Sequence, residues 1–254
     1  MIQKWKLTYP AYTGEELRRA YVYIPAEAKK YPEKRYPVLY MFDGHNVFFD
    51  KDATYGKCWG MKQYMDRTKT PVIIAAIECN HSRDGGRLSE YAPFSFHNAT
   101  LGDVTGRGKE TMEWLLSTFK PMIDRTFPTL PDRANTFIAG SSMGGLMSLF
   151  AVTGYNRFFK GAACLSPSVW FGAKELDSLL RTAEIADDTV IYMDYGACEL
   201  SNHRGMEKRL AKVASMLYAK KADLTFRIVP NGTHCEASWE KQIPFFMNTL
   251  FYEA

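Results

Sequence analysis

The hydrophobic pattern of the chain alternates between short apolar runs and longer segments with helical spacing. Each run has little polar interruption, which is typical of a strand that is buried on both faces. The runs occupy residues 37–42, 72–77, 136–139, 161–166, 189–195 and 224–229. Strands that alternate with helices in this way predict an α/β fold, with a mostly parallel sheet and helices packed on both faces.

Two segments near the N-terminus, residues 4–9 and 19–24, predict strands joined around Gly14 that form an antiparallel ribbon at the edge of the sheet. Helical spacing predicts helices at residues 59–67, 111–127 (kinked by Pro121), 206–217 and 239–250. Residues 79–109 are polar and rich in glycine, which predicts a long loop with a function. The sequence has no repeat or linker, so we expect a single domain spanning residues 1–254.

The amino-acid composition and the charge distribution argue against several classes of protein. Hydrophobic residues make up 46% and charged residues 24% of the chain, as in an ordinary soluble globular protein. The net charge of +4 comes from scattered basic pairs without a basic stripe, so we expect no nucleic-acid partner. No leader pattern and no long apolar run is present, so we expect neither export nor a membrane span. The five cysteines include no C-x-x-C pair, which predicts free thiols in the cytoplasm.

One stretch, residues 136–152, combines a predicted buried strand, a tight turn and a predicted helix. The turn reads G-S-S-M-G, a G-x-S-x-G pattern with Ser142 at its centre. The pattern alone also occurs by chance, but the strand before it and the helix after it match the nucleophile elbow of α/β-hydrolases. The N-terminus of the helix favours negative charge at the same place. The sequence therefore predicts Ser142 as a nucleophile.

A serine nucleophile needs a base and an orienting acid, which this fold supplies in the chain order serine, acid, histidine. His234 follows the last predicted strand and is the predicted base. Two carboxylates compete for the role of acid, Asp194 inside a predicted strand and Glu199 just beyond it. We favour Glu199 because it lies past the turn at Gly196, where its side chain can face a histidine from the next loop.

Acyl transfer also requires two backbone N–H groups that stabilise the oxyanion. We expect one from Met143, directly after the nucleophile, and the other from His45, in the turn after the first parallel strand. A turn residue with a solvated ring is the alternative role of His45. No two histidines have metal-ligand spacing, so the sequence predicts no metal site, and no cofactor is expected.

Segments from most of the chain support this interpretation. They read PVLYMFDGHNVFF, RLSEYAP, FIAGSSMGGLMSL, LSPSVW, YMDYGACE and GTHCEASW. Together they resemble the Putative esterase family of α/β-hydrolases, which includes esterase D-type, feruloyl, acetylxylan and enterochelin esterases. The resemblance implies that Ser142 and His234 are nucleophile and base. It places Glu199 at the acid of a G-T-x-[DE] pattern, which here reads G-A-C-E. It also places Arg87 on a loop facing the site, where an internal ion pair is the alternative to substrate contact.

These residues predict a serine carboxylic-ester hydrolase that works through an acyl-enzyme on a small-molecule ester. The chain has no extended apolar insertion for a lid, so we expect an open site bounded by residues 79–109 and by Trp170 and Phe171. An open site favours short acyl or aromatic-acyl esters of a polar alcohol such as a sugar or a siderophore. The alternatives are an acyltransferase of the mycolyltransferase type and a thioesterase of the S-formylglutathione hydrolase type.

Overall fold

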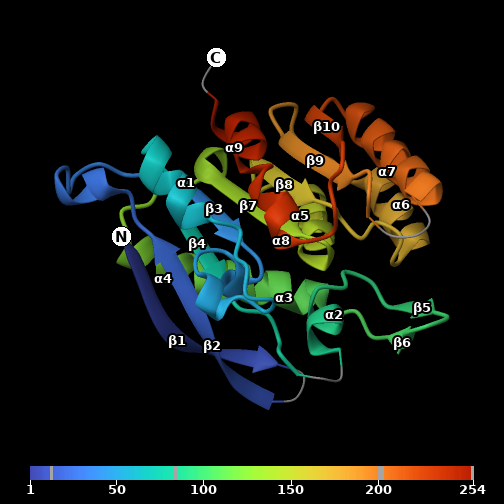
Figure 1. Cartoon of the computed structure of the whole chain (residues 1–254), viewed down its shortest axis with the longest axis horizontal. Coiled ribbons are helices and arrows are strands. Elements are labelled where there is room, and N and C mark those ends of the chain that lie inside the picture. The colour runs from blue at the N-terminus through green and yellow to red at the C-terminus, as the bar shows by residue number, and fades with distance from the viewer. Residues whose placement is uncertain (12–13, 83–84, 200–202, 253–254) are drawn as a thin grey trace.

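An eight-stranded sheet forms the centre of the computed structural model, which describes residues 1–11, 14–82, 85–199 and 203–252 (Figure 1). The strand order is β1-β2-β4-β3-β7-β8-β9-β10. The strands from β4 to β10 in that order are parallel, whereas the β1–β2 and β2–β4 pairs are antiparallel. Their bounds are β1 (Ile2–Ala11), β2 (Gly14–Tyr23), β3 (Val38–Met41), β4 (Ile73–Ile77), β7 (Thr136–Ser141), β8 (Gly161–Leu165), β9 (Val190–Gly196) and β10 (Asp223–Val229). The predicted α/β-hydrolase fold with an antiparallel N-terminal ribbon is confirmed.

Helices cover both faces of this sheet (Figure 1). The helices are α1 (Met61–Thr68), α2 (Gly86–Glu90), α3 (Gly108–Trp114), α4 (Lys120–Thr126), α5 (Met143–Gly154), α6 (Ala173–Thr182), α7 (His203–Tyr218), α8 (Glu236–Glu240) and α9 (Ile243–Phe251). Successive side chains of a strand point to opposite faces, so each strand contributes to two apolar cores. In β3, Val38 and Tyr40 belong to the core beneath α3 to α7, and Leu39 and Met41 belong to the core beneath α1, α8 and α9.

The carboxyl ends of the parallel strands meet at one edge of the sheet, which is where ligands bind in such folds. A 3₁₀ turn, η2 (Gly44–Asn46), follows β3, and Ser142 follows β7. Ser166, Glu199 and His234 follow β8, β9 and β10. The topology therefore gathers the predicted site residues at a single edge.

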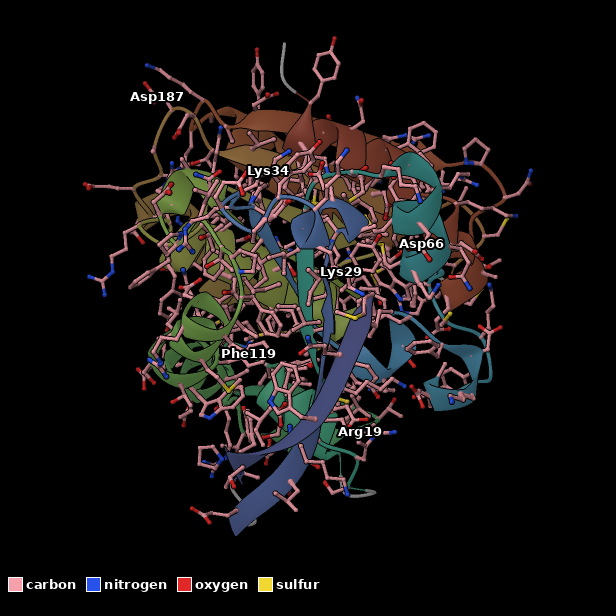
Figure 2. The ribbon with its side chains drawn as sticks, turned by 90° about the vertical axis from the view of Figure 1, so that its left-hand side faces the viewer. Arg19, Lys29, Lys34, Asp66, Phe119 and Asp187 are labelled. Atoms are coloured by element: carbon pink, nitrogen blue, oxygen red, sulfur yellow. The ribbon has the colours of Figure 1, made fainter. Side chains whose placement is uncertain are left out.

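The surface carries charges of both signs (Figure 2). Lys29, Lys34 and Asp187 are exposed, whereas the ring of Phe119 is completely buried and stacks on Trp114 with ring centroids 5.7 Å apart. Within the residues that the structure describes, none of the helices combines the length and the apolar composition needed to cross a membrane.

Residues 79–109, predicted as one long loop, are more structured than expected. They contain α2, the hairpin of β5 (Phe96–Asn98) and β6 (Gly102–Val104), and the start of α3. The hairpin extends away from the central sheet (Figure 1). These elements are too short to produce a periodic apolar pattern, so the sequence analysis could not detect them.

The helix predicted at residues 111–127 begins earlier and contains a π-helical turn, η4 (Leu115–Phe119), directly before Pro121. The N–H of Lys120 donates to the carbonyl of Leu115, five residues back. Pro121 has no N–H to donate and its ring would clash with the preceding turn of an ideal helix. The wider π turn therefore replaces the simple kink that the sequence predicted.

The C-terminal helix predicted at residues 239–250 is two helices, because the chain bends at Lys241 and Gln242 and α9 begins again with Pro244 in its first turn. Helix α6 was not predicted, since its buried residues are only Leu176 and Leu180. The apolar face predicted for the C-terminal segment is nevertheless fully buried, and consists of Trp239, Ile243, Phe246, Met247 and Leu250.

Candidate active site

The G-x-S-x-G turn has the geometry of a nucleophile elbow. Ser142 has φ 58° and ψ −120°, a strained conformation that residues with a side chain rarely adopt. Its N–H donates to the carbonyl of Leu165 at 2.9 Å. A Cβ atom on Gly140 would lie 2.6 Å from the backbone of Gly144, so the crossing of strand and helix requires glycine. The turn places Ser142 at the N-terminus of α5.

The turn after β3 packs directly against this elbow. A Cβ atom on Gly144 would lie 3.2 Å from the Cβ of Phe42 and 3.3 Å from the Oδ2 of Asp43. The same turn is equally close to the end of β4, because a Cβ atom on Gly44 would lie 2.9 Å from the backbone of Ile77. The η2 turn is therefore closely packed on two sides, against the backbone of Ile77 on one side and through the side chains of Phe42 and Asp43 against the elbow on the other.

The two predicted oxyanion donors begin neighbouring turns, Met143 in α5 and His45 in η2. The first N–H groups of a helix have no acceptor within it. In the described part of the chain neither of these two N–H groups donates to another residue. The ring of His45 is buried, at 3% exposure, which corrects the alternative of a solvated ring. Burial lowers the pKa of His45 to about 4, so its ring is neutral near pH 7.

Glu199 and His234 form a close pair in which the carboxylate is buried and the imidazole is partly exposed. The Oε2 of Glu199 lies 2.7 Å from the Nδ1 of His234, and Glu199 is 3% exposed. Its Oε1 accepts from the N–H of Gly196 at 2.8 Å and from the hydroxyl of Ser166. The side chain of His234 is 28% exposed. Because an ionised carboxylate can only accept, Nδ1 carries the proton and Nε2 keeps its lone pair.

Ser166 supports the pair of Glu199 and His234. Its hydroxyl donates to Glu199 and accepts from the Nε1 of Trp239 at 3.0 Å. The ring of Trp239 packs edge-on against that of His234, with centroids 5.1 Å apart. The backbone of Ser166 has φ 43°, and its N–H donates to the Oδ1 of Asp194 at 3.0 Å. These contacts fix the orientation of both the carboxylate and the imidazole.

Asp194, the competing acid, is fully buried inside β9 and is bonded elsewhere. Its Oδ1 accepts from Ser166, and its Oδ2 accepts from the hydroxyl of Tyr192 at 2.9 Å. Burial raises the pKa of Asp194 to about 7, with a smaller contribution from the charge of Glu199. Of the two carboxylates, the structure places Glu199 and not Asp194 against His234.

The hydroxyl of Ser142 lies 3.4 Å from that of Ser168, and the N–H of Ser168 donates to the carbonyl of Ser142 at 3.1 Å. Among the described residues no hydrogen bond joins Ser142 to His234. Such bonds are often long in free hydrolases and shorten when substrate binds. The structure thus brings Glu199 and His234 together, and it brings Ser142 to the same loop, residues 166–168, that supports this pair.

Trp170 and Phe171 lie in the segment that follows Ser168, and both are half-buried. The ring of Phe171 stacks on Phe96 of β5, with ring centroids 4.7 Å apart and an angle of 23° between the planes. The structure therefore brings together the two segments that the sequence analysis expected to bound the site.

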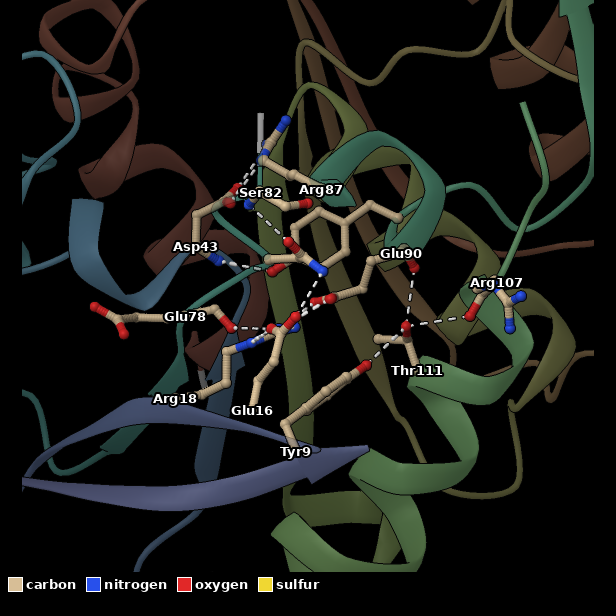
Figure 3. Close-up of polar contacts among 12 residues, drawn as sticks. Tyr9, Glu16, Arg18, Asp43, Glu78, Ser82, Arg87, Glu90, Arg107 and Thr111 are labelled. Carbon is tan, nitrogen blue, oxygen red and sulfur yellow. Dashed lines mark hydrogen bonds and ion pairs between the residues drawn. The ribbon is translucent and has the colours of Figure 1, made fainter. Parts of the chain in front are cut away.

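Arg87 forms a two-point ion pair with Asp43 (Figure 3). Its Nε and Nη2 donate to the two carboxylate oxygens at 2.7 and 2.6 Å. Burial alone would raise the pKa of Asp43, but the guanidinium outweighs burial and holds this pKa below its ordinary value. The backbone of Asp43 has a further partner, because its N–H donates to the hydroxyl of Tyr91 at 3.2 Å. Arg87 therefore forms an ion pair, the alternative to substrate contact, but its partner Asp43 lies outside residues 79–109, and the pair joins α2 to the turn that contains His45.

A second ion pair fixes the other end of α2 (Figure 3). Both carboxylate oxygens of Glu90 lie 2.9 Å from the Nη1 of Arg18, a residue of β2 that is 2% exposed. The hydroxyl of Thr111 donates to the carbonyl of Glu90 at 2.9 Å. Arg87 and Glu90 thus pair with residues outside their own segment, which anchors residues 86–90 beside the site.

Comparison with known proteins identifies the family of the chain. The sequence profile of the Esterase family, described as Putative esterase, matches residues 12–248. The chain belongs to this family. Membership makes it a carboxylic ester hydrolase, which confirms the predicted class of enzyme.

Solved structures show that this esterase shares its fold with several other proteins. The BES protein from Bacillus cereus is 18% identical with a TM-score of 0.74, over 99% of this chain and 95% of that chain. A ferulic acid esterase is 16% identical with a TM-score of 0.67, over 98% and 97% of the two chains. The siderophore hydrolase EstA from Aspergillus nidulans is 18% identical with a TM-score of 0.70, over 97% and 94%.

Three side chains of the esterase site were not predicted. Ser166 and Ser168 lie in LSPSVW, a segment that supported the resemblance, but only Trp170 within it received a role. Their position directly after β8, at the same edge of the sheet as Ser142, is the signal that could have identified them. Glu236 follows His234 by two residues and is 6% exposed, and burial raises the pKa of its carboxyl group.

Proposed function

We propose that this esterase uses Ser142 as nucleophile, His234 as general base and Glu199 as orienting acid. The observation that supports this assignment most strongly is the 2.7 Å contact between the Oε2 of Glu199 and the Nδ1 of His234, at the same sheet edge as the strained Ser142. A carboxylate in this position holds the imidazole in the tautomer whose Nε2 can accept a proton, and it stabilises the imidazolium that forms.

The reaction proceeds in two halves. His234 removes the proton from Ser142 as its hydroxyl oxygen attacks the ester carbonyl, and the C–O bond to the alcohol breaks as His234 returns the proton to the leaving oxygen. The N–H groups of Met143 and His45 stabilise the oxyanion in between. Water, deprotonated by His234, then attacks the acyl-enzyme and releases the acid. The neutral ring of His45 adds no charge beside this oxyanion.

The proposed substrate is a short acyl or aromatic-acyl ester of a polar alcohol such as a sugar or a siderophore. The aromatic side chains of Trp170 and Phe171, half-buried in the segment after Ser168, provide a surface for an aromatic acid. Arg87 keeps 33% of its side chain exposed and presents a cation beside Asp43. The similarity in fold to a ferulic acid esterase and to a siderophore hydrolase is consistent with such esters.

Hydrolysis is favoured over acyl transfer because water can reach the base. The side chain of His234 is 28% exposed, so solvent has access to the acyl-enzyme. An acyltransferase would have to exclude this water in favour of an alcohol. Product analysis with p-nitrophenyl butyrate and added trehalose or glucose distinguishes hydrolysis from acyl transfer. We expect free butyrate as the main product, whereas a butyryl sugar would indicate the acyltransferase; S-formylglutathione as a better substrate would indicate the thioesterase.

The experiment that tests the proposal is hydrolysis of p-nitrophenyl butyrate by the wild type and by Ser142→Ala. Removing the nucleophile should lower kcat by about 10⁴ or more while the protein stays folded. Ser117→Ala is the matched control, because Ser117 is an exposed serine whose hydroxyl lies 3.4 Å from that of Thr118, and it has no role in the proposed site. Activity of Ser142→Ala within about tenfold of the wild type would contradict the proposal.

We also propose that the esterase works in a reducing compartment such as the cytoplasm. The structure describes all five cysteines as free, and three of them, Cys58, Cys79 and Cys164, are buried. Unpaired thiols of this kind persist where glutathione keeps them reduced.

A further inference from the structure

Three side chains beside the η2 turn form a cluster that ester hydrolysis does not use. His45, Cys79 and His81 each offer one ligand atom, and these atoms lie within 4.8 Å of one another. The rings of the two histidines are in edge contact, with centroids 4.5 Å apart. His45 follows β3, whereas Cys79 and His81 follow β4, the strand that pairs with β3. The cluster therefore joins two neighbouring strand ends that are far apart in the sequence.

One ring nitrogen of this cluster is buried without a partner. The Nε2 of His45 lies 3.0 Å from the hydroxyl of Thr54, whereas its Nδ1 has no hydrogen-bond partner among the described residues. The Thr54 hydroxyl can donate or accept, and in the tautomer in which Nε2–H donates to it, Nδ1 carries a lone pair. A buried lone pair without a donor is unfavourable, and each such group in a folded protein calls for an explanation.

We propose that His45, Cys79 and His81 bind one divalent ion of the zinc class. Two imidazole nitrogens and one thiolate are a ligand set that Zn²⁺ and Co²⁺ prefer, with water in the fourth position. Histidine ligands usually donate their other N–H to an oxygen, which is the role that Thr54 has toward His45. When the ion binds, the thiol of Cys79 releases its proton to solvent and its sulfur forms the bond to the metal.

The ligand atoms of the cluster are somewhat farther apart than they would be around a bound ion. Bonds of about 2.0 Å to nitrogen and about 2.3 Å to sulfur place tetrahedral ligand atoms roughly 3.3–3.8 Å apart. His45 and Cys79 are buried and fixed, whereas His81 is exposed. A rotation of the His81 side chain can therefore close the site, and its exposure gives the ion a route of entry. This inference does not depend on the roles proposed for Ser142, Glu199 and His234.

Cobalt titration of the metal-free full-length protein tests the proposal. We expect binding of one Co²⁺ per chain, with the visible bands of tetrahedral cobalt and the near-ultraviolet band of a cobalt–thiolate bond, and loss of both when Zn²⁺ is added. Zinc should also raise the melting temperature, because it binds only the folded protein. Absence of both bands at saturating Co²⁺ would overturn the proposal.

Single substitutions identify the ligands. Cys79→Ser should remove the thiolate band, and His81→Ala should weaken cobalt binding by about tenfold or more. Because His81 is exposed, its replacement leaves the fold intact even if Cys79→Ser does not. Cys164→Ser, at another buried cysteine, and His97→Ala, at another exposed histidine, are the matched controls and should keep both bands. Loss of the thiolate band in Cys164→Ser, or unchanged binding in His81→Ala, would contradict the assignment.

Discussion

At the scale of single residues, the choice between two carboxylates decides how the imidazole is oriented. Glu199 contacts the Nδ1 of His234, whereas Asp194 is bonded to the backbone of Ser166 and to Tyr192. We therefore expect Glu199→Gln to lower kcat for p-nitrophenyl butyrate by up to about 10⁴, because the imidazolium loses its negative partner. Asp194→Asn should retain most of the activity. Steady-state kinetics of the two folded variants make the comparison.

The opposite order of activities in the two variants would assign the role of orienting acid to Asp194. If Asp194→Asn were inactive at an unchanged melting temperature while Glu199→Gln stayed active, Asp194 would be the residue that orients His234. Circular dichroism of both variants controls for folding.

Asp194 gives a separate prediction about stability and pH. Its pKa is raised to about 7 in the folded protein, against about 3.9 in an unfolded chain, so the folded state binds this proton more tightly. This proton contributes to the free energy of unfolding at low pH. The contribution, up to about 4 kcal/mol, is lost as the pH rises from about 4 to about 7. The stability advantage of the wild type over Asp194→Asn should therefore shrink over this range.

Urea denaturation between pH 4.5 and pH 7.5 measures this difference. The groups that act on Asp194 besides burial are Ser166, Tyr192, Glu199 and Arg227, and all of them remain in the variant. Asp187→Asn, at an exposed surface position, is the control (Figure 2). A difference between wild type and Asp194→Asn that stays constant or grows with pH would contradict the raised pKa.

The sequence predicts candidate site residues where one local pattern defines them. Ser142 was predicted because its strand, turn and helix are contiguous, and His234 because it follows the last strand. Ser166 was missed because its hydroxyl bonds to Glu199 from one loop and to Trp239 from another. A contact among three separate segments produces no recognisable pattern within the sequence of any one of them.

At the scale of the elements, the fit between the η2 turn and β4 should control the oxyanion site. A Cβ atom on Gly44 would lie 2.9 Å from the backbone of Ile77, which cannot move without disturbing the sheet. Gly44→Ala should therefore displace the turn and the N–H of His45. Losing one such donor costs about 10²–10³ in kcat, so we expect a loss of roughly tenfold or more in this variant.

The matched control is Gly154→Ala at the end of α5, where the added Cβ would lie 3.4 Å from the ring of Phe150, an ordinary van der Waals distance. That variant should keep its kcat for p-nitrophenyl butyrate. Wild-type kcat in Gly44→Ala, with the variant folded, would show that the turn does not position an oxyanion donor.

The sequence predicts the elements that are uniformly buried. It does not predict the elements whose structure depends on a few contacts with distant residues. The central strands β3, β4, β7 and β8 are buried throughout, and their predicted and observed positions agree closely. The segment of α2 and the β5–β6 hairpin owes its structure to distant partners, such as the pairs of Arg87 with Asp43 and Glu90 with Arg18. These partners lie in other parts of the chain, so no local pattern could reveal them.

At the scale of the whole molecule, the shape of the site edge should select short acyl groups. The stacked rings of Phe96 and Phe171 join the β5–β6 hairpin to the segment between Ser168 and α6. Ion pairs of Arg87 and Glu90 anchor α2. We expect kcat/KM to be highest for p-nitrophenyl acetate and butyrate and to fall steeply toward palmitate. Initial rates below the critical micelle concentration measure this series, and a rise from butyrate to palmitate would indicate a lipase.

The central claim is that Ser142 is the nucleophile of this esterase, and covalent labelling tests it most directly. A fluorophosphonate reacts with an activated serine, and intact-mass spectrometry counts the labels. We expect one label per chain in the wild type, located at Ser142 by peptide mapping, and none in Ser142→Ala. The competing hydroxyl is that of Ser168, 3.4 Å away. Equal labelling of Ser142→Ala, or a label on Ser168 in the wild type, would contradict the account.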